Sequence, residues 1–292
     1  MVEFVNAKIN IGLQVVARRE DGYHDLQTLF YPVGLYAGTP GNPVEFCDIL
    51  EIVPVPADSI PGPFTLVTSG RRVDCPQEKN LVWRAAQAYF SRGVADGFAV
   101  SIRLDKHLPD GAGMGGGSAD AAFTLRMLAD LEREYAGTCA GESELHAMAL
   151  RLGADCPFFL LNRPAYAEGV GEKLADVPLD LSGRWLLVVK PDVYVSTREA
   201  FAGITPRPAA FDLRGVASLP VEQWCGKVHN DFEDSIFALH PFMAGIKQAL
   251  YDSGALYASL TGSGSCIYGI YDVPPADPPL PGPVESTYLL QL

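Results

Sequence analysis

The chain has 292 residues, of which 48% are hydrophobic and 20% charged, so it has the composition of a folded protein of one large or two smaller domains and not of a disordered one. Thirty-five acidic against 22 basic residues give a net charge of −13, which argues against a nucleic-acid partner but is compatible with a small anion held by backbone amides. No apolar run approaches the roughly 18 residues that a membrane-spanning helix needs, so we expect no membrane association.

The chain begins with a predicted β-hairpin. Apolar and polar residues alternate over 5–15, a pattern typical of a strand with one buried face. Asp21-Gly22 marks a turn and residues 26–35 are extended again, so we expect these two strands to pair. The glycines and prolines of 37–46 then predict a surface loop.

Three helices are predicted in the middle of the chain. The spacing of apolar residues indicates one over 80–92 with Asn80 as its N-cap, a second over 118–135 and a third over 142–152. A strand is predicted over 97–104, so the chain passes from a strand into the second of these helices.

Beyond residue 162 the pattern changes, and we expect a domain boundary near this point. The first domain is then residues 1–164 and the second residues 165–292. Strands are predicted over 165–168, over 185–190 and on both sides of 262–264, a helix over 242–253, and an irregular proline-rich segment over 273–283.

The cysteines and histidines form no recognisable site. The six cysteines include no CxxC pair, and the five histidines show neither HxxxH nor HExxH spacing. We therefore expect reduced thiols, no zinc site, and no metal other than one that arrives with a ligand. The first residues lack the basic and apolar regions of a signal peptide, so a cytoplasmic location is expected.

The strongest chemical signal is the glycine-rich segment 109–122, which has five glycines between residues 111 and 117. It joins a predicted strand to a predicted helix, so its amides and the helix N-terminus are suited to bind phosphate, and a flexible linker is the less favoured alternative. The segment lacks the lysine of a Walker A motif. It matches GxGxxG, but the acidic residue expected about 20 residues later in a dinucleotide fold falls on Glu134, within a predicted helix.

With two further segments, this loop resembles the three motifs of the GHMP kinase superfamily. The first motif is Ala7-Lys8-Ile9-Asn10 with Asp21-Gly22-Tyr23-His24, the second is the glycine-rich segment, and the third is Thr261-Gly262-Ser263-Gly264-Ser265. The first motif and Leu152-Gly153-Ala154-Asp155-Cys156-Pro157 resemble the branch that phosphorylates the 2-hydroxyl of a cytidine-diphosphate-linked polyol in the non-mevalonate route to isoprenoid precursors.

The resemblance implies an α+β, two-domain GHMP kinase fold. Its N-terminal domain is ribosomal protein S5 domain 2-like and binds ATP, and its C-terminal domain is ferredoxin-like, with a last strand that can return to the first domain. The resemblance also implies Mg²⁺ with the ATP, a small-molecule substrate with a cytidine diphosphate group, and a monomer or homodimer.

The resemblance also gives each candidate site residue a role. Asp155 matches the base that takes the hydroxyl proton, and Lys8 matches the residue that supports the ionising hydroxyl. The ATP-binding positions are Asn80 and Lys106 near the adenine, with Pro109, Asp110, Gly111, Ala112, Gly113, Met114, Gly115, Gly116, Gly117, Ser118 and Ala119. The substrate-binding positions are Asn10, Tyr23, His24, Thr197, Phe201, Gly262, Ser263 and Gly264, of which Tyr23, His24 and Phe201 match a clamp on the cytosine.

These residues also have ordinary structural explanations. Lys8 can be a solvated strand lysine, Asp155 a turn residue, Phe201 a core residue, Asn80 an N-cap and Lys106 an exposed strand end. Three other functions stay open: an oxidoreductase using GxGxxG, a GHMP kinase for another alcohol such as mevalonate, homoserine or a sugar, and a nucleotide sensor without turnover. Stabilisation by NAD(H) or ATP, competition by CMP and turnover distinguish them.

Overall fold

The computed structural model describes residues 1–34 and 46–292. They form two compact units, each built from several stretches of the chain. The first unit comprises residues 1–7, 46–110 and 115–162, and the second comprises residues 8–34, 111–114 and 163–292. The boundary predicted at residue 164 lies close to the last passage between units, but residues 8–34 and 111–114 pack with the second unit.

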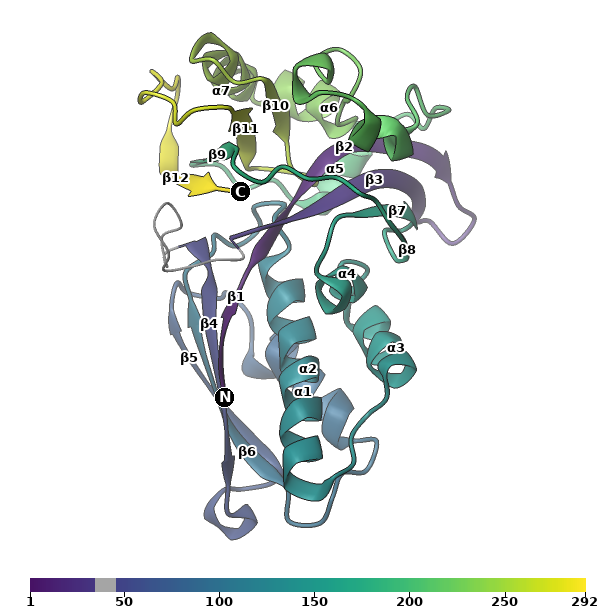
Figure 1. Cartoon of the computed structure of the whole chain (residues 1–292), viewed down its shortest axis with the longest axis vertical. Helices are drawn as coiled ribbons and strands as arrows, with labels where there is room; N and C mark the ends of the chain where they lie inside the picture. The colour runs from purple at the N-terminus through teal and green to yellow at the C-terminus, as the bar shows by residue number, and fades with distance from the viewer. Residues whose placement is uncertain (35–45) are drawn as a thin grey trace. The chain divides into compact units, whose positions relative to one another are not determined.

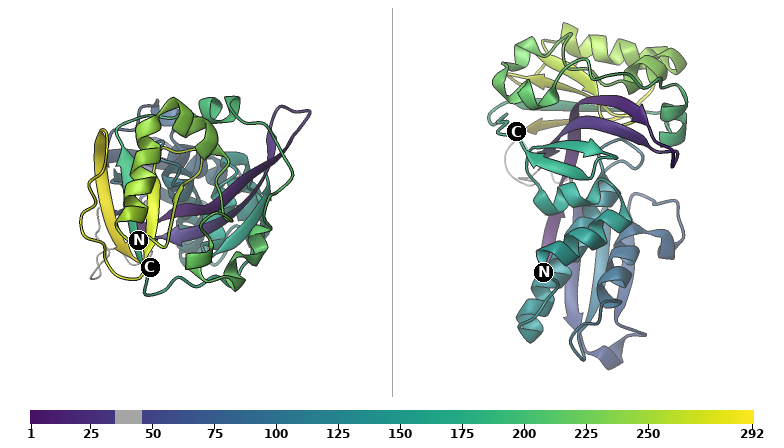
Figure 2. Two further views of the ribbon diagram at one scale, coloured as in Figure 1. Left: turned by 90° about the horizontal axis from the view of Figure 1, so that it is seen from above. Right: turned by 90° about the vertical axis from the view of Figure 1, so that its right-hand side faces the viewer.

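The first unit is a four-stranded sheet whose strands follow the order β1-β4-β6-β5 (Figure 1). Only the β5–β6 pair is parallel. Two long helices, α1 and α2, pack together against the sheet, and α3 and α4 pack against these helices (Figure 2). The bounds are β1 (Val2–Val5), β4 (Asp48–Val55), β5 (Phe64–Gly70), β6 (Ala99–Lys106), α1 (Leu81–Phe90), α2 (Gly116–Ala136), α3 (Glu142–Leu152) and α4 (Cys156–Leu161).

The second unit contains two four-stranded sheets, β2-β3-β7-β8 and β10-β11-β9-β12. Helix α7 packs on β10 and β11, and α6 packs beside α7. The bounds are β2 (Ala7–Arg18), β3 (His24–Val33), β7 (Ala165–Gly169), β8 (Lys173–Asp176), β9 (Trp185–Pro191), β10 (Tyr257–Leu260), β11 (Ile267–Tyr271), β12 (Val284–Gln291), α5 (Thr197–Ala202), α6 (Phe232–Leu239) and α7 (Pro241–Asp252).

Strand β2 is buried on both faces, so the prediction of a half-buried strand was wrong. Its polar residues Lys8, Asn10 and Gln14 are at most 5% exposed. Each has partners inside the second unit; the amide of Gln14, for example, accepts from the N–H of Ala210 at 2.6 Å. Alternation of apolar and polar residues indicates solvent on one face only when the polar side chains lack internal partners.

The remaining predicted elements are confirmed within a few residues, including the hairpin of β2 and β3 and the irregular segment before β12. The last strand, β12, pairs with β9 in the second unit. The loop predicted over 37–46 lies outside the described residues except for Phe46, which is fully buried. No helix in the described part of the chain has the length and apolar content to cross a membrane.

Candidate active site

The ammonium group of Lys8 is buried within the second unit. Lys8 lies on β2 and is 3% exposed. Its Nζ donates to the side-chain oxygen of Asn10 at 2.6 Å and to the carbonyl oxygen of Gly113 at 2.9 Å. It also lies 5.1 Å from the ring centroid of Phe30. A buried cation needs such acceptors to replace its lost hydration, so Lys8 is not a solvated strand lysine.

Asn10 is held so that its side-chain oxygen faces Lys8. Its Nδ2 donates to the hydroxyl of Thr28 at 2.9 Å, which leaves the amide oxygen for the ammonium. Its backbone N–H donates to the hydroxyl of Thr261 at 3.1 Å, and its carbonyl accepts from the hydroxyl of Tyr268 at 2.8 Å. Asn10 of the first motif is therefore fixed by Thr28 on β3, Thr261 after β10 and Tyr268 on β11.

The glycine-rich segment passes from the first unit to the second and back. Residues 111–114 pack with the second unit, where Gly113 has φ +75° and a Cβ would lie 2.0 Å from the carbonyl oxygen of Thr261. A side chain is therefore excluded at Gly113. Gly115, with φ +73°, is the N-cap of α2 in the first unit. The amides of the first turn of α2 have no partner within the helix, which is the arrangement that binds anions.

The third motif forms the turn between β10 and β11. Gly262 and Gly264 have φ of +55° and +90°. The N–H of Gly264 donates to the carbonyl of Thr261 at 3.0 Å, and the Thr261 hydroxyl donates to the carbonyl of Gly113 at 3.1 Å. Thus Gly262, Ser263 and Gly264 form a hairpin turn that packs on the second motif.

Asn80, Lys106, Asp110 and Gly117 line one cavity of about 220 Å³ in the first unit. All four are predicted ATP-binding positions. Asn80 is also the N-cap of α1, because its side chain accepts from the N–H of Val82 at 2.9 Å. Lys106 is 6% exposed, so it is not an exposed strand end. The four predicted positions therefore meet at this cavity and not on the outer surface of the protein.

The ammonium group of Lys106 is shared by two carboxylates that sequence reasoning missed. It donates to Asp120 at 2.7 Å and to Asp48. Burial lowers the pKa of Lys106, but the charges of Asp120 and Asp48 outweigh it and raise the pKa above its ordinary value. Burial and the charge of Asp48 raise the pKa of Asp120 to about 8, although Lys106 opposes this. Asp120 lies two residues after Ser118 within the second motif, and this position could have indicated that Asp120 belongs to the site.

Asp48 accepts hydrogen bonds through both of its carboxylate oxygens. Its Oδ1 accepts from the backbone N–H of His107 at 2.7 Å and of Leu108 at 2.9 Å, while its Oδ2 accepts from Lys106. Asp120 accepts from Lys106 through Oδ2, and its buried Oδ1 has no hydrogen-bond partner among the described residues. Burial and the charge of the neighbouring Asp48 therefore both disfavour the charged form of Asp120.

Asp155 lies in the first unit, directly before α4. It is half-buried. Its neighbour Cys156 is hydrogen-bonded to Ser118, at the start of α2, and burial raises the pKa of the Cys156 thiol to about 12. Asp155 therefore lies where the second motif enters its helix, whereas Lys8 packs with the second unit.

Two of the candidate cytosine-binding residues, His24 and Phe201, meet in the second unit. Their rings are stacked with 4.7 Å between the centroids, and Tyr23, which precedes His24 in the chain, is 64% exposed. Thr197 is exposed at the first position of α5, the helix that carries Phe201. Tyr194, which sequence reasoning missed, packs its ring against Gly111, where a Cβ would lie 2.7 Å from it.

Two family models match the chain: "GHMP kinases N terminal domain" over residues 80–163 and "GHMP kinases C terminal" over residues 220–277. The chain is 44% identical to the 4-diphosphocytidyl-2-C-methyl-D-erythritol kinase of Parabacteroides distasonis over 94% of this chain and 93% of the relative. It is 40% identical to the protein of the same name in Porphyromonas gingivalis over 93% of this chain and 92% of the relative.

Solved structures agree with these relatives. A crystal structure of 4-(cytidine 5'-diphospho)-2C-methyl-D-erythritol kinase matches with a TM-score of 0.73 and 31% identity, over 94% of this chain and 91% of that one. The mevalonate kinase of Methanococcus jannaschii, at 12% identity and a TM-score of 0.62 over 93% and 90% of the two chains, shares the fold alone. The chain is therefore a kinase of the GHMP family, in the branch whose curated members are named 4-diphosphocytidyl-2-C-methyl-D-erythritol kinase.

Proposed function

We propose that this kinase transfers the γ-phosphoryl group of ATP to the 2-hydroxyl of 4-diphosphocytidyl-2-C-methyl-D-erythritol, in the non-mevalonate route to isoprenoid precursors. The observation that carries the proposal is the buried ammonium of Lys8, fixed by Asn10 of the first motif and Gly113 of the second. A buried, oriented cation is what a developing alkoxide requires. The names of the relatives supply the substrate.

In this proposal Asp155 is the general base and Lys8 stabilises the charge that develops on the hydroxyl oxygen. A carboxylate held before a helix has a fixed orientation, and transfer of the hydroxyl proton to it leaves an oxygen nucleophile for the phosphorus. Lys8 cannot take the proton while it carries its own, so the two residues have separate roles. Most of the catalysis then comes from positioning and electrostatics.

The glycine-rich segment fits the triphosphate of ATP. At Gly113 a Cβ would overlap backbone atoms, and Gly115 leaves the first turn of α2 open to an anion. The cavity lined by Asn80 and Lys106 fits the adenosine part, since it offers polar atoms beside apolar walls. In this cavity the ammonium group of Lys106 is bound by the carboxylates of Asp120 and Asp48, so Lys106 is not a free cation there.

Magnesium is expected with the ATP. The described residues contain no group of three or more His, Cys, Asp or Glu side chains that could hold a metal ion by themselves. This fits an ion that binds mainly through phosphate oxygens and water, with the Ser118 hydroxyl as a suitable oxygen ligand. When bound, the ion neutralises charge on the phosphate groups.

The cytosine of the substrate is proposed to bind at Tyr23, His24 and Phe201. Rings stack on a nucleobase, and the imidazole and phenol can hydrogen-bond its edge. The exposed ring of Tyr23 and the paired rings of His24 and Phe201 provide both kinds of surface. A GHMP kinase for a small alcohol without a base would not need them.

The test is ADP formation by the purified protein with Mg-ATP, with and without 4-diphosphocytidyl-2-C-methyl-D-erythritol. We expect substrate-dependent turnover that falls roughly 10²- to 10⁴-fold in Asp155→Asn. Asp176→Asn makes the same change at an exposed aspartate of β8 and should retain full activity. CMP should compete with the substrate.

Two results contradict the proposal in different ways. Turnover with mevalonate or homoserine, but not with the cytidine substrate, would show that the protein is a kinase for a different substrate. Wild-type rates in Asp155→Asn would show that Asp155 is not the general base and would leave the substrate assignment unaffected.

A further inference from the structure

The segment 229–233 is attached to the middle of β2, the strand that carries Lys8. The backbone N–H of Leu13 donates to the carbonyl of His229 at 2.9 Å, and that of Asp231 donates to the carbonyl of Leu13 at 2.8 Å. The Asp231 carboxylate accepts from the N–H of Val15 at 2.8 Å. These bonds fix the backbone around Asn230 relative to the first motif.

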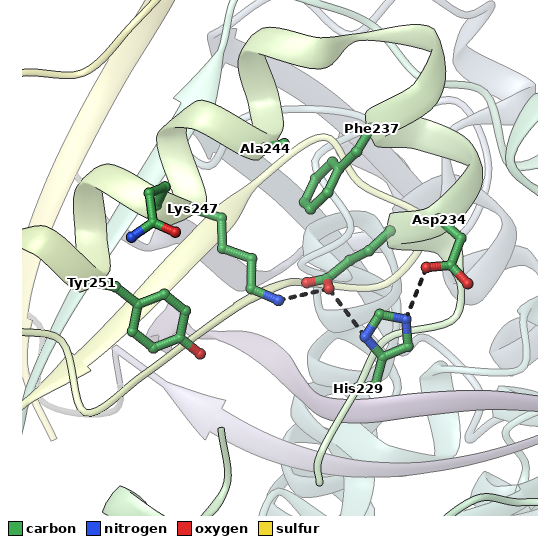
Figure 3. Close-up of a pocket in the computed structure, with 8 residues that line it drawn as sticks. His229, Asp234, Phe237, Ala244, Lys247 and Tyr251 are labelled. Carbon is green, nitrogen blue, oxygen red and sulfur yellow. Dashed lines mark hydrogen bonds and ion pairs between the residues drawn. The ribbon is translucent and has the colours of Figure 1, made fainter. Parts of the chain in front are cut away.

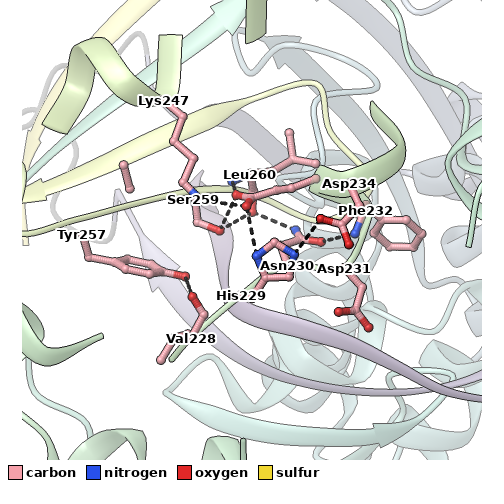
Figure 4. A network of polar contacts seen from close by, with 12 residues as sticks. Val228, His229, Asn230, Asp231, Phe232, Asp234, Lys247, Tyr257, Ser259 and Leu260 are labelled. Atoms are coloured by element: carbon pink, nitrogen blue, oxygen red, sulfur yellow. Dashed lines mark hydrogen bonds and ion pairs between the residues drawn. The ribbon is translucent and has the colours of Figure 1, made fainter. Parts of the chain in front are cut away.

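The side chain of Asn230 lies between this segment and the third motif. It is completely buried, and its Nδ2 donates to the carbonyl of Leu260 at 2.8 Å (Figure 4). The same Nδ2 donates to the carbonyl of Gly262 at 2.9 Å. Its Oδ1 accepts from the N–H of Phe232 at 3.0 Å, which orients the amide. Two donors and one acceptor on one planar group are required here, and no other side chain of this size supplies them.

A second side chain of the segment, that of Glu233, binds the end of β10 by accepting from its backbone N–H. The buried carboxylate of Glu233 accepts from the N–H of Leu260 at 2.9 Å and the hydroxyl of Ser259 at 3.2 Å. Its other oxygen accepts from Lys247 at 2.7 Å and lies 3.3 Å from His229, at the edge of a cavity of about 370 Å³ (Figure 3). Glu233 thus fixes β10, and Asn230 reaches the turn beyond it.

The turn that Asn230 holds is in direct contact with the atoms that hold Lys8. A Cβ on Gly262 would lie 2.9 Å from the carbonyl oxygen of Gly113, so the two backbones touch. That oxygen accepts from both the Thr261 hydroxyl at 3.1 Å and Lys8 Nζ at 2.9 Å. A shift of the turn therefore moves an acceptor of the ammonium group.

We propose that Asn230 is a positioning residue for phosphoryl transfer: its amide fixes the Gly262 carbonyl, so that Thr261 and Gly113 keep the Lys8 ammonium where the hydroxyl ionises. The inference rests on the proposed role of Lys8. Asn230 does not touch substrate or ATP in this account. Its effect is on the rate of the chemical step and not on binding.

The test compares Asn230→Asp with Asp231→Asn. The first variant keeps the shape of the side chain but replaces two donors to carbonyl oxygens by a carboxylate oxygen that repels them. The second changes the adjacent residue, which holds Val15 and Arg207 and does not reach the turn. We expect kcat to fall about 10- to 100-fold in Asn230→Asp, with KM for ATP and for the cytidine substrate changed less than about 3-fold. Asp231→Asn should lose stability but keep kcat.

A direct measurement on the turn accompanies the kinetics. Amide hydrogen exchange should be faster in Asn230→Asp at Gly264 and Cys266, whose N–H groups bond Thr261 and Ala112. Should Asn230→Asp fail to fold, Thr261→Val removes the hydroxyl without touching Asn230 and should lower kcat similarly. In a double variant the two losses should be less than additive, since they act on one contact.

Wild-type kcat in Asn230→Asp, or an equal loss in Asp231→Asn, would overturn the inference. Proportional increases in both KM values would show a general structural role and overturn it as well. If the wild-type protein does not phosphorylate the cytidine substrate, the proposed function fails instead. In that case hydrogen exchange still tests whether Asn230 fixes the turn. Unchanged exchange in Asn230→Asp would refute this, and faster exchange would support it.

Discussion

The imidazole of His24 lies nearly parallel to the phenyl ring of Phe201, with 17° between the ring planes and 4.7 Å between their centroids. Phe201 also makes an edge-to-face contact with Phe232, with 4.9 Å between the ring centroids. Phe201 therefore packs on the hydrophobic core of the second unit and also stacks on His24. His24 lies at the start of β3 and is partly buried.

This geometry predicts that His24→Ala weakens binding of the cytidine substrate. A stacking contact with a base contributes about 1–3 kcal/mol, so KM for that substrate should rise roughly 5- to 150-fold while KM for ATP stays constant. Initial rates at varied substrate measure this, with CMP inhibition as a second reading. His146→Ala on the exposed face of α3 is the matched control. An unchanged KM in His24→Ala would place the cytosine elsewhere.

Replacement of Lys8 by methionine should lower kcat. Met keeps most of the volume of the side chain but removes the charge beside Asn10 and Gly113, and loss of one such oxyanion-stabilising donor costs about 10²- to 10³-fold. The kcat of Lys173→Met, on the exposed part of β8, should not change. Thermal unfolding of both variants separates loss of chemistry from loss of fold; equal kcat values would remove Lys8 from the mechanism.

Glycine is required at 113 but not at 117. Gly113 has φ +75°, and a Cβ there would lie 2.0 Å from the backbone oxygen of Thr261, whereas at Gly117, within α2, the nearest atom is a side-chain carbon at 3.5 Å. Gly113→Ala should therefore lower stability by about 1–3 kcal/mol, and Gly117→Ala should change it by less than about 1 kcal/mol. Urea unfolding measures both. Equal losses of stability in Gly113→Ala and Gly117→Ala would contradict the close contact between Gly113 of the second motif and Thr261 of the third.

Asp120 predicts a pH dependence of the first unit. Its pKa is raised from 3.8 to about 8 by burial and by Asp48, so between these values the folded state holds a proton that the unfolded chain has released. The contribution of Asp120 to stability is fully present below pH 4 and is lost as the pH rises through 8. The wild type should therefore lose more stability than Asp120→Asn between pH 5 and pH 8.5. Urea unfolding at both pH values checks the sign, and the opposite difference would assign the proton to another group.

His229 predicts a second, smaller dependence. Its hydrogen bond to Glu233 raises its pKa above 6.5, although burial opposes the shift. Its contribution to stability is present below pH 6.5 and is lost as the pH rises through the folded-state pKa. His229→Gln should therefore differ from the wild type more at pH 6 than at pH 8.5. The same difference at both values would show that the ring is neutral in the folded protein.

The sequence by itself determined most of the secondary structure and the family. Periods of two and of three to four residues are local properties, so strands such as β9 and helices such as α2 follow from neighbours along the chain. The three motifs, of which the first contains Lys8, and the segment 152–157, which contains Asp155, likewise need no tertiary information. From the sequence alone they indicate a phosphate-binding kinase.

Only the tertiary structure decided how these pieces are held. The sequence predicted Lys106 as an ATP-binding residue, with an exposed strand end as the alternative, and did not indicate the two carboxylates, 58 and 14 residues away along the chain, that hold its ammonium group. Lys8 depends in the same way on Gly113, 105 residues later, and Asn230 reaches Gly262 from a segment that no motif includes. A buried charge or amide is stabilised by whichever acceptors the folded chain brings to it, and spacing in the sequence does not encode those partners.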